Sequence, residues 1–534
     1  NNDSISMRKA PLMGNHPLLR NISLVSTALS TILCLMISPL AALVPSAIPM
    51  AYVLASKLKP VIAKKAFLKS CEEELPFAAS FISMLVASGI SPSRAFEKLS
   101  NTKTFKSFRS LANEVLKIRQ VHALNPLDAI SLKADQLSSE NIRDFLHSIT
   151  SIQRSGGDTF AAILAKTKEI HVAFNSKMLS LADKANLMAN IEVLLFVIIP
   201  MSLLSIFALF GSSSSSLLAS SLFLPLLFFT ILLATIRSFF PSIILSARNL
   251  KPLLVFSTMS CVLAAFSHYL LKLNIHISSA LGLTLSSIIG LLIGEEAFST
   301  HELFNALADF SRDLAEEVKK GIAPKNALIQ LTNLKQYRKN FKDLLKLLLQ
   351  SYHLGLDPVK IVYNSKTPTA VKMFFELFNE AESVGADFKS MDVIAELYNS
   401  LRTAINSTKA KLLTFKFASY LCTFLLVFSI SLLVEAILPT LYQPLFNTPL
   451  PYGIIPSYSS INYDLIKDLA YLGVFVNSYM LGFLGGYITS FGSIRESFKE
   501  AIRCLLIALI GYMFLTNLCS RLILPLGGLM PWRT

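Results

Sequence analysis

The sequence lacks the short motifs that most catalytic and metal sites require. No glycine is followed by lysine, so the phosphate-binding loop GxxxxGK[ST] is absent and nucleotide hydrolysis is not expected. The six cysteines form no CxxC pair, and the eight histidines form no HExxH or related metal-ligand spacing. A hydrolytic triad built from distant residues stays open, but no residue selects one. The sequence therefore predicts a chain that is not an enzyme and that has no metal and no cofactor.

Charged residues are also scarce. They make up 16% of the 534 residues, whereas 53% are hydrophobic and the mean hydropathy is +0.54, which lies outside the soluble globular range. Apolar runs long enough to cross a bilayer as helices predict about nine transmembrane helices, at 22–37, 40–56, 191–211, 217–236, 252–271, 277–294, 413–438, 469–491 and 501–524. Prolines interrupt the first two runs, so a bent or re-entrant pair, and a total of seven or eight spans, stay open.

The basic residues indicate an orientation. The chain begins with Asn1 and shows no secretory signal pattern, so we interpret its first apolar run as an anchor. If the amino terminus and the long polar segments are cytoplasmic, only Lys272, Lys467, Arg521 and Arg533 lie outside, four of 49 basic residues. The net charge of +15 is then a signature of membrane topology rather than of nucleic-acid binding. We predict a multi-pass protein of the cell membrane with cytoplasmic soluble domains.

Few polar features fall inside the apolar runs. Glu192 and Glu435 lie near span ends, and we expect both carboxylates to extend toward water. His276 lies near a predicted external loop and is expected to be solvated. The glycines of LGFLGGY at 481–487, and Gly290, are expected to let helices pack closely.

Two polar blocks, 57–190 and 295–412, share the same helix punctuation. Both are helical by pattern and almost free of strand signals. The motif GISP at 89–92 recurs as GIAP at 321–324, which is 232 residues later. In each copy a glycine ends one helix and a proline occupies the first position of the next, after a capping Ser91 in the first copy. We predict two homologous helical bundles.

Further anchors keep this register. NPLDAI at 125–130 matches DPVKIV at 357–362 after the same 232 residues, and SGGDTF at 155–160 matches VGADFK at 384–389 after 229. Each anchor places Asn or Asp before a helix, as an N-cap. Four predicted spans separate the blocks, so both blocks face one compartment. The predicted domains are an N-terminal segment with the first hairpin (1–56), bundle 1 (57–190), four spans (191–294), bundle 2 (295–412) and three C-terminal spans (413–534).

Basic linkers follow each GI(S/A)P corner. The first block carries 19 basic and 12 acidic residues and the second carries 16 and 15, so the first attracts anions more strongly. TKTFKSF at 102–108 aligns with LKQYRKN at 334–340, and either a solvated loop or docking of an acidic partner explains the shared pattern. The docking hypothesis selects Lys103, Phe105, Lys106, Arg109, Lys335, Tyr337, Arg338 and Lys339. The charged segment 493–503 is predicted to be a short cytoplasmic loop.

The stretch EEELPFAASFISMLVASGISPSRAFEKL, Glu72–Leu99, and its weaker copy resemble a known family. They are similar to the platform proteins of type IV filament machines, which include the type II secretion system F domain proteins, the TadB and TadC pair, and archaeal FlaJ (ArlJ). The resemblance covers roughly 57–240 and 295–492. Two blocks in one chain look like the archaeal arrangement, because TadC-like proteins carry one block and the bacterial secretion form has three spans.

The resemblance implies a protein without activity of its own. It implies a platform that anchors a hexameric secretion ATPase and couples its motion to insertion of type IV pilin-like subunits into a pilus or archaellum. The implied partners are the ATPase, pilin-like subunits and membrane lipids, with no nucleic acid; a monomer and a homodimer both stay open, as does the filament type. The alternatives are a solute transporter with cytoplasmic regulatory domains, which would need a polar midplane site, and a receptor or scaffold.

Overall fold

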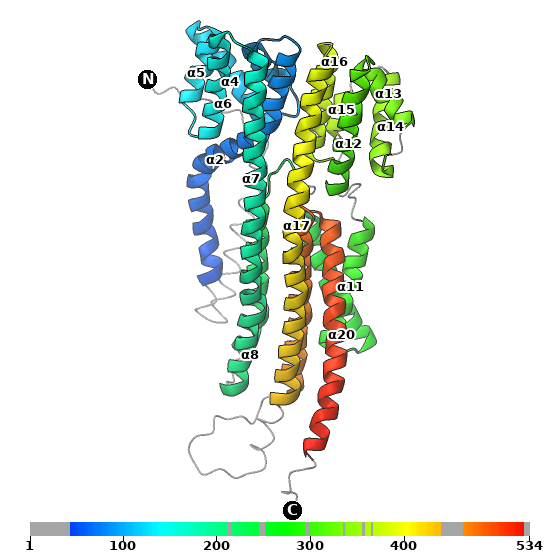
Figure 1. Ribbon diagram of the computed structural model, residues 1–534. Coiled ribbons are helices and arrows are strands. Elements are labelled where there is room, and N and C mark those ends of the chain that lie inside the picture. The colour runs from blue at the N-terminus through cyan, green and yellow to red at the C-terminus, as the bar shows by residue number, and fades with distance from the viewer. Residues whose placement is uncertain are drawn as a thin grey trace, which may run out of the picture. The chain divides into compact units, whose positions relative to one another are not determined.

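The computed structural model describes residues 43–210, 215–244, 251–293, 300–334, 337–354, 358–364, 367–438 and 463–527 (Figure 1). The chain divides into two compact units, Asn1–Cys71 and Glu72–Thr534. This division falls inside helix α2 (Leu43–Ala87), whose first part is the described portion of the first unit. All regular elements in the described ranges are helices, which confirms the all-α prediction there.

Two series of helices in the second unit carry the sequence repeat. The first series follows α2 and consists of α3 (Pro92–Lys98), η1 (Leu99–Asn101), α4 (Lys106–His122), α5 (Pro126–Asp135), α6 (Glu140–Ser155) and α7 (Thr159–Val193). The second consists of α12 (Thr300–Lys319), α13 (Pro324–Leu334), α14 (Lys339–His353), α15 (Pro358–Asn364), α16 (Thr369–Ser383) and α17 (Phe388–Leu432). The predicted corners fall at corresponding helix ends in both series.

The corners use the chemistry that the sequence predicts, with one exception. Gly89 and Gly321 adopt φ values of +86° and +91°, which a residue with a Cβ reaches only under strain. The side chains of Asp158 and Asp387 accept hydrogen bonds from backbone N–H groups in the first turns of α7 and α17. Ser91 occupies the N-cap position of α3, but its side chain makes no capping hydrogen bond.

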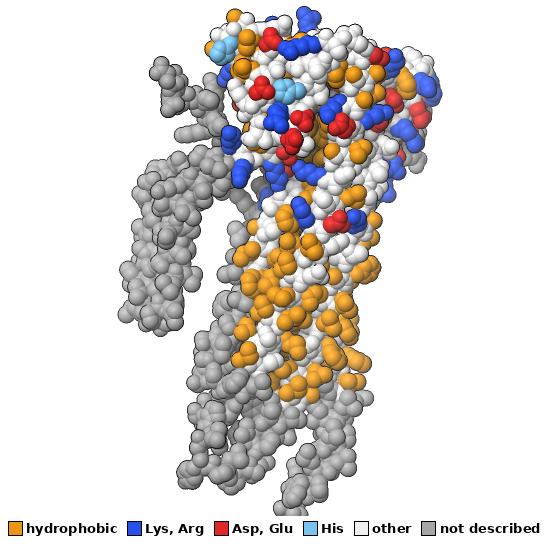
Figure 2. All heavy atoms as spheres, turned by 60° about the vertical axis from the view of Figure 1, so that its left-hand side comes forward, with side chains coloured by type: hydrophobic (Ala, Val, Ile, Leu, Met, Phe, Trp, Pro, Cys, Tyr) orange, Lys and Arg blue, Asp and Glu red, His pale blue; other side chains and the backbone are white. Residues whose placement is uncertain are grey.

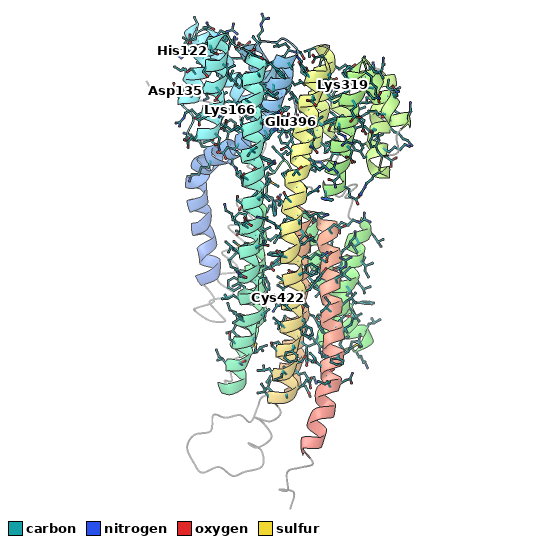
Figure 3. The ribbon with its side chains drawn as sticks, viewed as in Figure 1. His122, Asp135, Lys166, Lys319, Glu396 and Cys422 are labelled. Carbon is teal, nitrogen blue, oxygen red and sulfur yellow. The ribbon has the colours of Figure 1, made fainter. Side chains whose placement is uncertain are left out.

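Helices α7 and α17 continue from the soluble series into apolar segments. A π-turn, η2 (Leu194–Ile198), joins α7 to α8 (Ile199–Phe210), and a second, η3 (Leu433–Ile437), extends α17. The predicted boundaries at 190 and 412 therefore fall inside unbroken helix. The side chains of α17 change from charged to apolar along its length. In Figure 3 the charged Glu396 lies near the beginning of α17, and Cys422 lies far along the helix.

The two long helices pack side by side and run parallel (Figure 1). Lys411 Nζ lies 2.9 Å from Asp183 Oδ1, and the Thr414 hydroxyl donates to Asn186 Oδ1 at 3.0 Å. Both pairs join residues that are 228 positions apart, one fewer than the separation of the two N-caps. Positions that lie within one residue of correspondence in the repeat therefore face each other along this helix pair.

Five helices are long and apolar enough to cross a membrane, by length and composition. They are Thr159–Ile206, Ile275–Leu292, Phe388–Ile437, Ile466–Thr489 and Ile494–Leu518. These segments indicate a membrane protein and coincide with five of the nine predicted spans. Two more predicted spans, 217–236 and 252–271, form α9 (Ser215–Phe239) and α10 (Lys251–Leu271). The span 22–37 lies outside the described residues, and the total of nine stays a prediction.

The surface of the apolar segments suits lipid rather than water. On α17 large apolar side chains are exposed at helical spacing, among them Leu413, Phe417, Leu421, Phe424, Phe428 and Leu432. Figure 2 shows most of the charged side chains gathered at the upper end of this face, and apolar side chains, interspersed with other uncharged groups, along the lower part of the described surface. Such an apolar surface is stable in lipid and would drive aggregation in water.

Glycines set the spacing of the membrane helices, as predicted. A Cβ added to Gly482 or Gly486 of α19 (Tyr463–Thr489) would lie 2.6 Å from backbone atoms of α20 (Ile494–Gly527). Gly290 of α11 (Ile275–Ile293) would likewise meet the ring of Phe498 at 2.8 Å. The segment 493–503 is helical from Ile494 onward, so its prediction as a loop is wrong.

Candidate functional site: a linker held by two glutamates

The first basic linker is a short extended segment that leads from η1 into α4. Phe105, just before α4, is completely buried, and its ring lies 5.6 Å from that of Phe81 on α2. Thr102 and Thr104 are buried as well. The linker therefore lies against the helices with its backbone inside, so its N–H groups need hydrogen-bond partners within the protein.

Glu74 supplies one set of acceptors from α2. The backbone N–H groups of Ser107 and Phe108 each donate to its carboxylate at 2.9 Å. These N–H groups belong to the first turn of α4, where the helix itself provides no acceptor. The Glu74 carboxylate accepts their hydrogen bonds, and its negative charge interacts favourably with the positive end of the helix dipole. Burial raises the pKa of Glu74 to about 7, although the two N–H donors favour its charged form.

Glu376 supplies the other set from α16, in the second series. The N–H groups of Lys103 and Thr104 donate to its two carboxylate oxygens at 2.5 and 2.7 Å, and the Thr104 hydroxyl donates to the same group. Only 8% of Glu376 is exposed. A carboxylate of the second repeat thus orders the linker of the first, and 272 residues separate it from Thr104.

Further contacts join the two series around this linker. Lys98 of α3 forms an ion pair with Glu380, one turn beyond Glu376 on α16. The hydroxyl groups of Ser88 and Ser390 lie 3.0 Å apart. Because these contacts surround the linker, its conformation depends on both repeats.

The structure separates the predicted docking residues of the first linker by exposure. Lys106 and Arg109 are exposed on α4, and Lys103 is partly exposed. Phe105 is 0% exposed, so its side chain supports the linker from inside and presents no surface to a partner in this structure. The cationic residues remain candidates for docking, and that role stays a prediction.

The second linker is held differently. The Tyr337 hydroxyl donates to Asp313 Oδ2 at 2.8 Å, and burial and this carboxylate raise the Tyr337 pKa. Arg338 forms an ion pair of 2.6 Å with Glu302. Lys335 lies outside the described residues, and Lys339 begins α14 without a described side chain.

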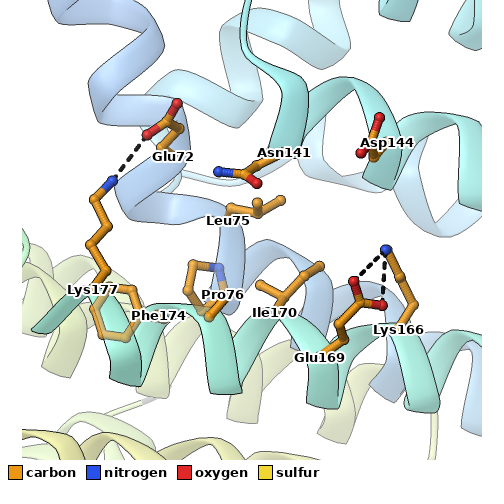
Figure 4. Close-up of a pocket in the computed structure, with 11 residues that line it drawn as sticks. Glu72, Leu75, Pro76, Asn141, Asp144, Lys166, Glu169, Ile170, Phe174 and Lys177 are labelled. Atoms are coloured by element: carbon orange, nitrogen blue, oxygen red, sulfur yellow. Dashed lines mark hydrogen bonds and ion pairs between the residues drawn. The ribbon is translucent and has the colours of Figure 1, made fainter. Parts of the chain in front are cut away.

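A small cleft between α2, α6 and α7 is a weaker candidate (Figure 4). Four of its five charged side chains pair with one another: Lys177 with Glu72 at 3.0 Å, and Lys166 with Glu169 at 2.9 Å, while Asp144 stands apart from these pairs. These pairs, drawn as dashed lines, leave little charge for a ligand. The cleft therefore offers no set of convergent groups of one chemical type.

Inside the apolar helices, Glu192 departs from the sequence-based expectation. It is 1% exposed and faces Ser419 of α17, so the expectation that its carboxylate extends to water is wrong. The reason is tertiary, because α7 turns this position toward α17. Within the described part of the chain, Glu192 Oε1 has no hydrogen-bond partner.

A second polar group lies near the ends of three apolar elements, η3, α19 and α11. Glu435 pairs with Lys467 at 2.7 Å and accepts a hydrogen bond from the Tyr471 hydroxyl at 3.1 Å. His276 is 1% exposed and lies 2.7 Å from Asp468, so its prediction as a solvated residue is wrong. These side chains form ion pairs and hydrogen bonds with one another, and we interpret them as a structural network.

No group of three or more His, Cys, Asp and Glu that could hold a metal ion occurs in the described ranges. Neither a known protein family nor a curated protein matches the sequence. Sequence reasoning found the basic linkers but missed Glu74 and Glu376. The run of three acidic residues at 72–74, directly before the apolar stretch LPFAASFISMLVA within α2, was a signal for Glu74. Glu376 offers no comparable local signal.

Proposed function

We propose that the chain is the membrane platform protein of an archaeal type IV pilus or archaellum assembly machine. In this role it anchors a hexameric secretion ATPase through cytoplasmic helical bundles and couples the motion of that ATPase to pilin insertion into the filament. The observation that carries the proposal is the continuity of α7 and α17. Each helix begins at the end of one soluble series, α7 after α6 and α17 after α16, and leads into an apolar segment.

This continuity supplies a mechanical route. An α-helix keeps its backbone hydrogen bonds along its length, so a displacement of its soluble end moves its apolar end without an intervening hinge. The contacts between α7 and α17, such as Lys411 with Asp183, make the two helices move together. The π-turns η2 and η3 interrupt the regular pattern inside the apolar segments, and such turns are frequent at functional sites.

Exposed cations supply the docking surface. Lys106 and Arg109 lie on α4 beside a linker whose backbone is fixed by Glu74 and Glu376. A fixed cationic surface speeds and orients the approach of an acidic partner. Because this chain has no phosphate-binding loop, the proposed machine takes its energy from a separate ATPase. We assign that ATPase as the acidic partner.

The test combines a binding assay with a phenotype. Charge reversal at Lys103, Lys106, Lys335 and Arg338 together is expected to abolish co-purification of the secretion ATPase and to abolish filaments, while the variant still accumulates in the membrane. Deletion of the gene should cost the cell swimming, surface attachment or aggregation, and the lost trait identifies the filament. Normal filaments and intact ATPase binding in the charge-reversal strain would refute the assignment of these residues to docking. Normal filaments in the deletion strain would refute the platform role.

One observation favours the alternative of a solute transporter. Glu192 is an acidic residue buried between apolar helices, and its Oε1 atom has no hydrogen-bond partner among the described residues. Such residues commonly bind protons or ions in transporters. If Glu192→Gln abolished proton-coupled uptake by proteoliposomes while filaments persisted, the transporter would replace the platform.

A further inference from the structure

Two lysines from different repeats lie over one tyrosine ring. Lys106 Nζ, from the beginning of α4, lies 5.9 Å from the centroid of the Tyr363 ring. Lys372 Nζ, from α16, lies 5.6 Å from the same centroid and donates a hydrogen bond to the Tyr363 carbonyl oxygen at 2.8 Å. Tyr363 belongs to α15 and is 38% exposed. Its ring stabilises both ammonium groups at a surface that a partner can reach.

Within the described residues, no acidic side chain forms an ion pair with either of these two positive charges. Burial, and then the charge of Lys106, lower the pKa of Lys372. The two ammonium groups therefore repel each other, and an anion bound between them would relieve that repulsion.

Glu376 creates this juxtaposition. It lies one helical turn beyond Lys372 on α16, and it holds the backbone of Lys103 and Thr104. This places the beginning of α4, with Lys106, beside α15 and α16. The same face of α16 thus fixes the linker with a carboxylate and contributes a cation beside it.

The available donors favour a carboxylate over a phosphate. Phosphate sites usually use free backbone N–H groups at a helix N-terminus. At α4 those of Ser107 and Phe108 donate to Glu74, so an incoming anion meets side chains only. Lys106, Tyr363 and Lys372 belong to α4, α15 and α16, none of which is a candidate span, and the test below includes a lipid head group as a competing anion.

We propose that Lys106, Tyr363 and Lys372 form a composite anion site, built from both repeats, that binds an acidic side chain of a protein partner. The identity of that partner as the secretion ATPase rests on the proposed function, whereas the site itself does not. Both repeats are required, because Lys106 comes from the first and the other two residues come from the second. Glu376 is a positioning residue for this site.

The test uses the full chain in nanodiscs of zwitterionic lipid and a fluorescein-labelled peptide of ten glutamates as the probe. Fluorescence anisotropy at about 50 mM salt keeps electrostatic attraction measurable. The double variant Lys106→Gln, Lys372→Gln is expected to weaken binding about tenfold or more. Lys360→Gln, which removes one charge from α15 at an exposed position, should change binding less than about twofold.

Glu376→Gln gives the sharper test. By charge alone, removal of a negative group beside the site should strengthen binding of a polyanion. The composite site predicts the opposite, because a neutral amide holds the linker less firmly and Lys106 then leaves Tyr363. We expect binding about threefold weaker, with unchanged helical content by circular dichroism.

Three outcomes would overturn the proposal. The first is unchanged peptide binding by the double lysine variant, and the second is tighter peptide binding by the Glu376→Gln variant. The third is competition: inorganic phosphate or phosphatidylglycerol vesicles would displace the labelled peptide at a lower concentration than unlabelled glutamate peptide does. If the lysine variants lose the peptide but still co-purify the secretion ATPase, the anion site stands and its assignment to the ATPase falls. If an unaltered chain binds the peptide but no ATPase, the platform role falls alone.

Discussion

The two basic linkers share a sequence pattern but use their carboxylates in opposite ways. In the first linker, Glu74 and Glu376 bind backbone N–H groups. In the second, Asp313 binds the Tyr337 hydroxyl and Glu302 binds the Arg338 guanidinium. A carboxylate that binds backbone leaves neighbouring cationic side chains available, whereas one that binds a cation neutralises it. This difference is why we propose the first linker, rather than the second, as the docking surface for an anion, and the greater positive charge of its block favours the same choice.

The two linkers differ in their contacts although the corners that precede them have the same backbone form. The glycines that end α2 and α12 have nearly the same φ, and both following helices begin with proline. Among the many positions at which the copies differ, the acidic residues that contact each linker account for the contrast described above. Four predictions test the contrast.

The largest effect is expected from Glu376→Ala. It would leave the buried N–H groups of Lys103 and Thr104 without an acceptor, which should lower the free energy of unfolding by about 3 kcal/mol. Thermal unfolding in detergent micelles, followed by circular dichroism, measures the change. The matched control is Glu380→Ala, which removes a partly exposed ion pair with Lys98 and should cost less than about 1 kcal/mol. Equal effects of the two substitutions would show that Glu376 does not hold the linker.

The next effect is a pH dependence from Glu74. Its folded-state pKa of about 7 lies above the ordinary value of 4.5, so between these values the folded state binds more protons than the unfolded state. Stability should therefore fall as pH rises from 4.5 to 7, by at most about 3 kcal/mol, and should stay level above this window. Unfolding midpoints from pH 4.5 to 8 measure the slope. Glu74→Gln should flatten it, and Glu316→Gln, at an exposed position of α12, should leave it unchanged.

A smaller effect is expected in the second linker from Tyr337→Phe. The substitution removes the hydrogen bond to Asp313 and leaves the ring contacts with Phe310 and Phe341 in place, so the loss should be about 1 kcal/mol. Tyr363→Phe, at an exposed ring, is the control and should have almost no effect on stability. A loss as large as that of Glu376→Ala would mean that both linkers depend on buried carboxylates to the same degree.

The smallest effect is expected from Arg338→Gln on binding of the glutamate peptide. Because Glu302 already neutralises Arg338, removal of the guanidinium should weaken binding less than about twofold. Glu302→Gln should instead expose the cation and strengthen binding slightly. Anisotropy titrations of both variants measure this, and a loss as large as that of the double lysine variant would make the second linker an equal docking site.

The corners of both series could be predicted because they depend on local chemistry. Gly89 and Gly321 end helices through a backbone conformation that favours glycine, and Asp158 and Asp387 cap helices within three residues of themselves. The roles of Glu376, Lys372 and Glu192 could not be predicted. Each depends on which distant helix lies opposite, and no local pattern carries that information.

The sequence by itself determined the helical class, the apolar segments and the repeat, because periodicity, helix caps and hydropathy act over a few residues to a few turns. Tertiary structure alone decided that Glu376 reaches the linker of the other repeat, that Lys106 and Lys372 share one tyrosine, and that Glu192 points inward. The physical reason is that burial and electrostatic pairing depend on the distance between atoms in space, which helix packing sets across separations of more than 200 residues.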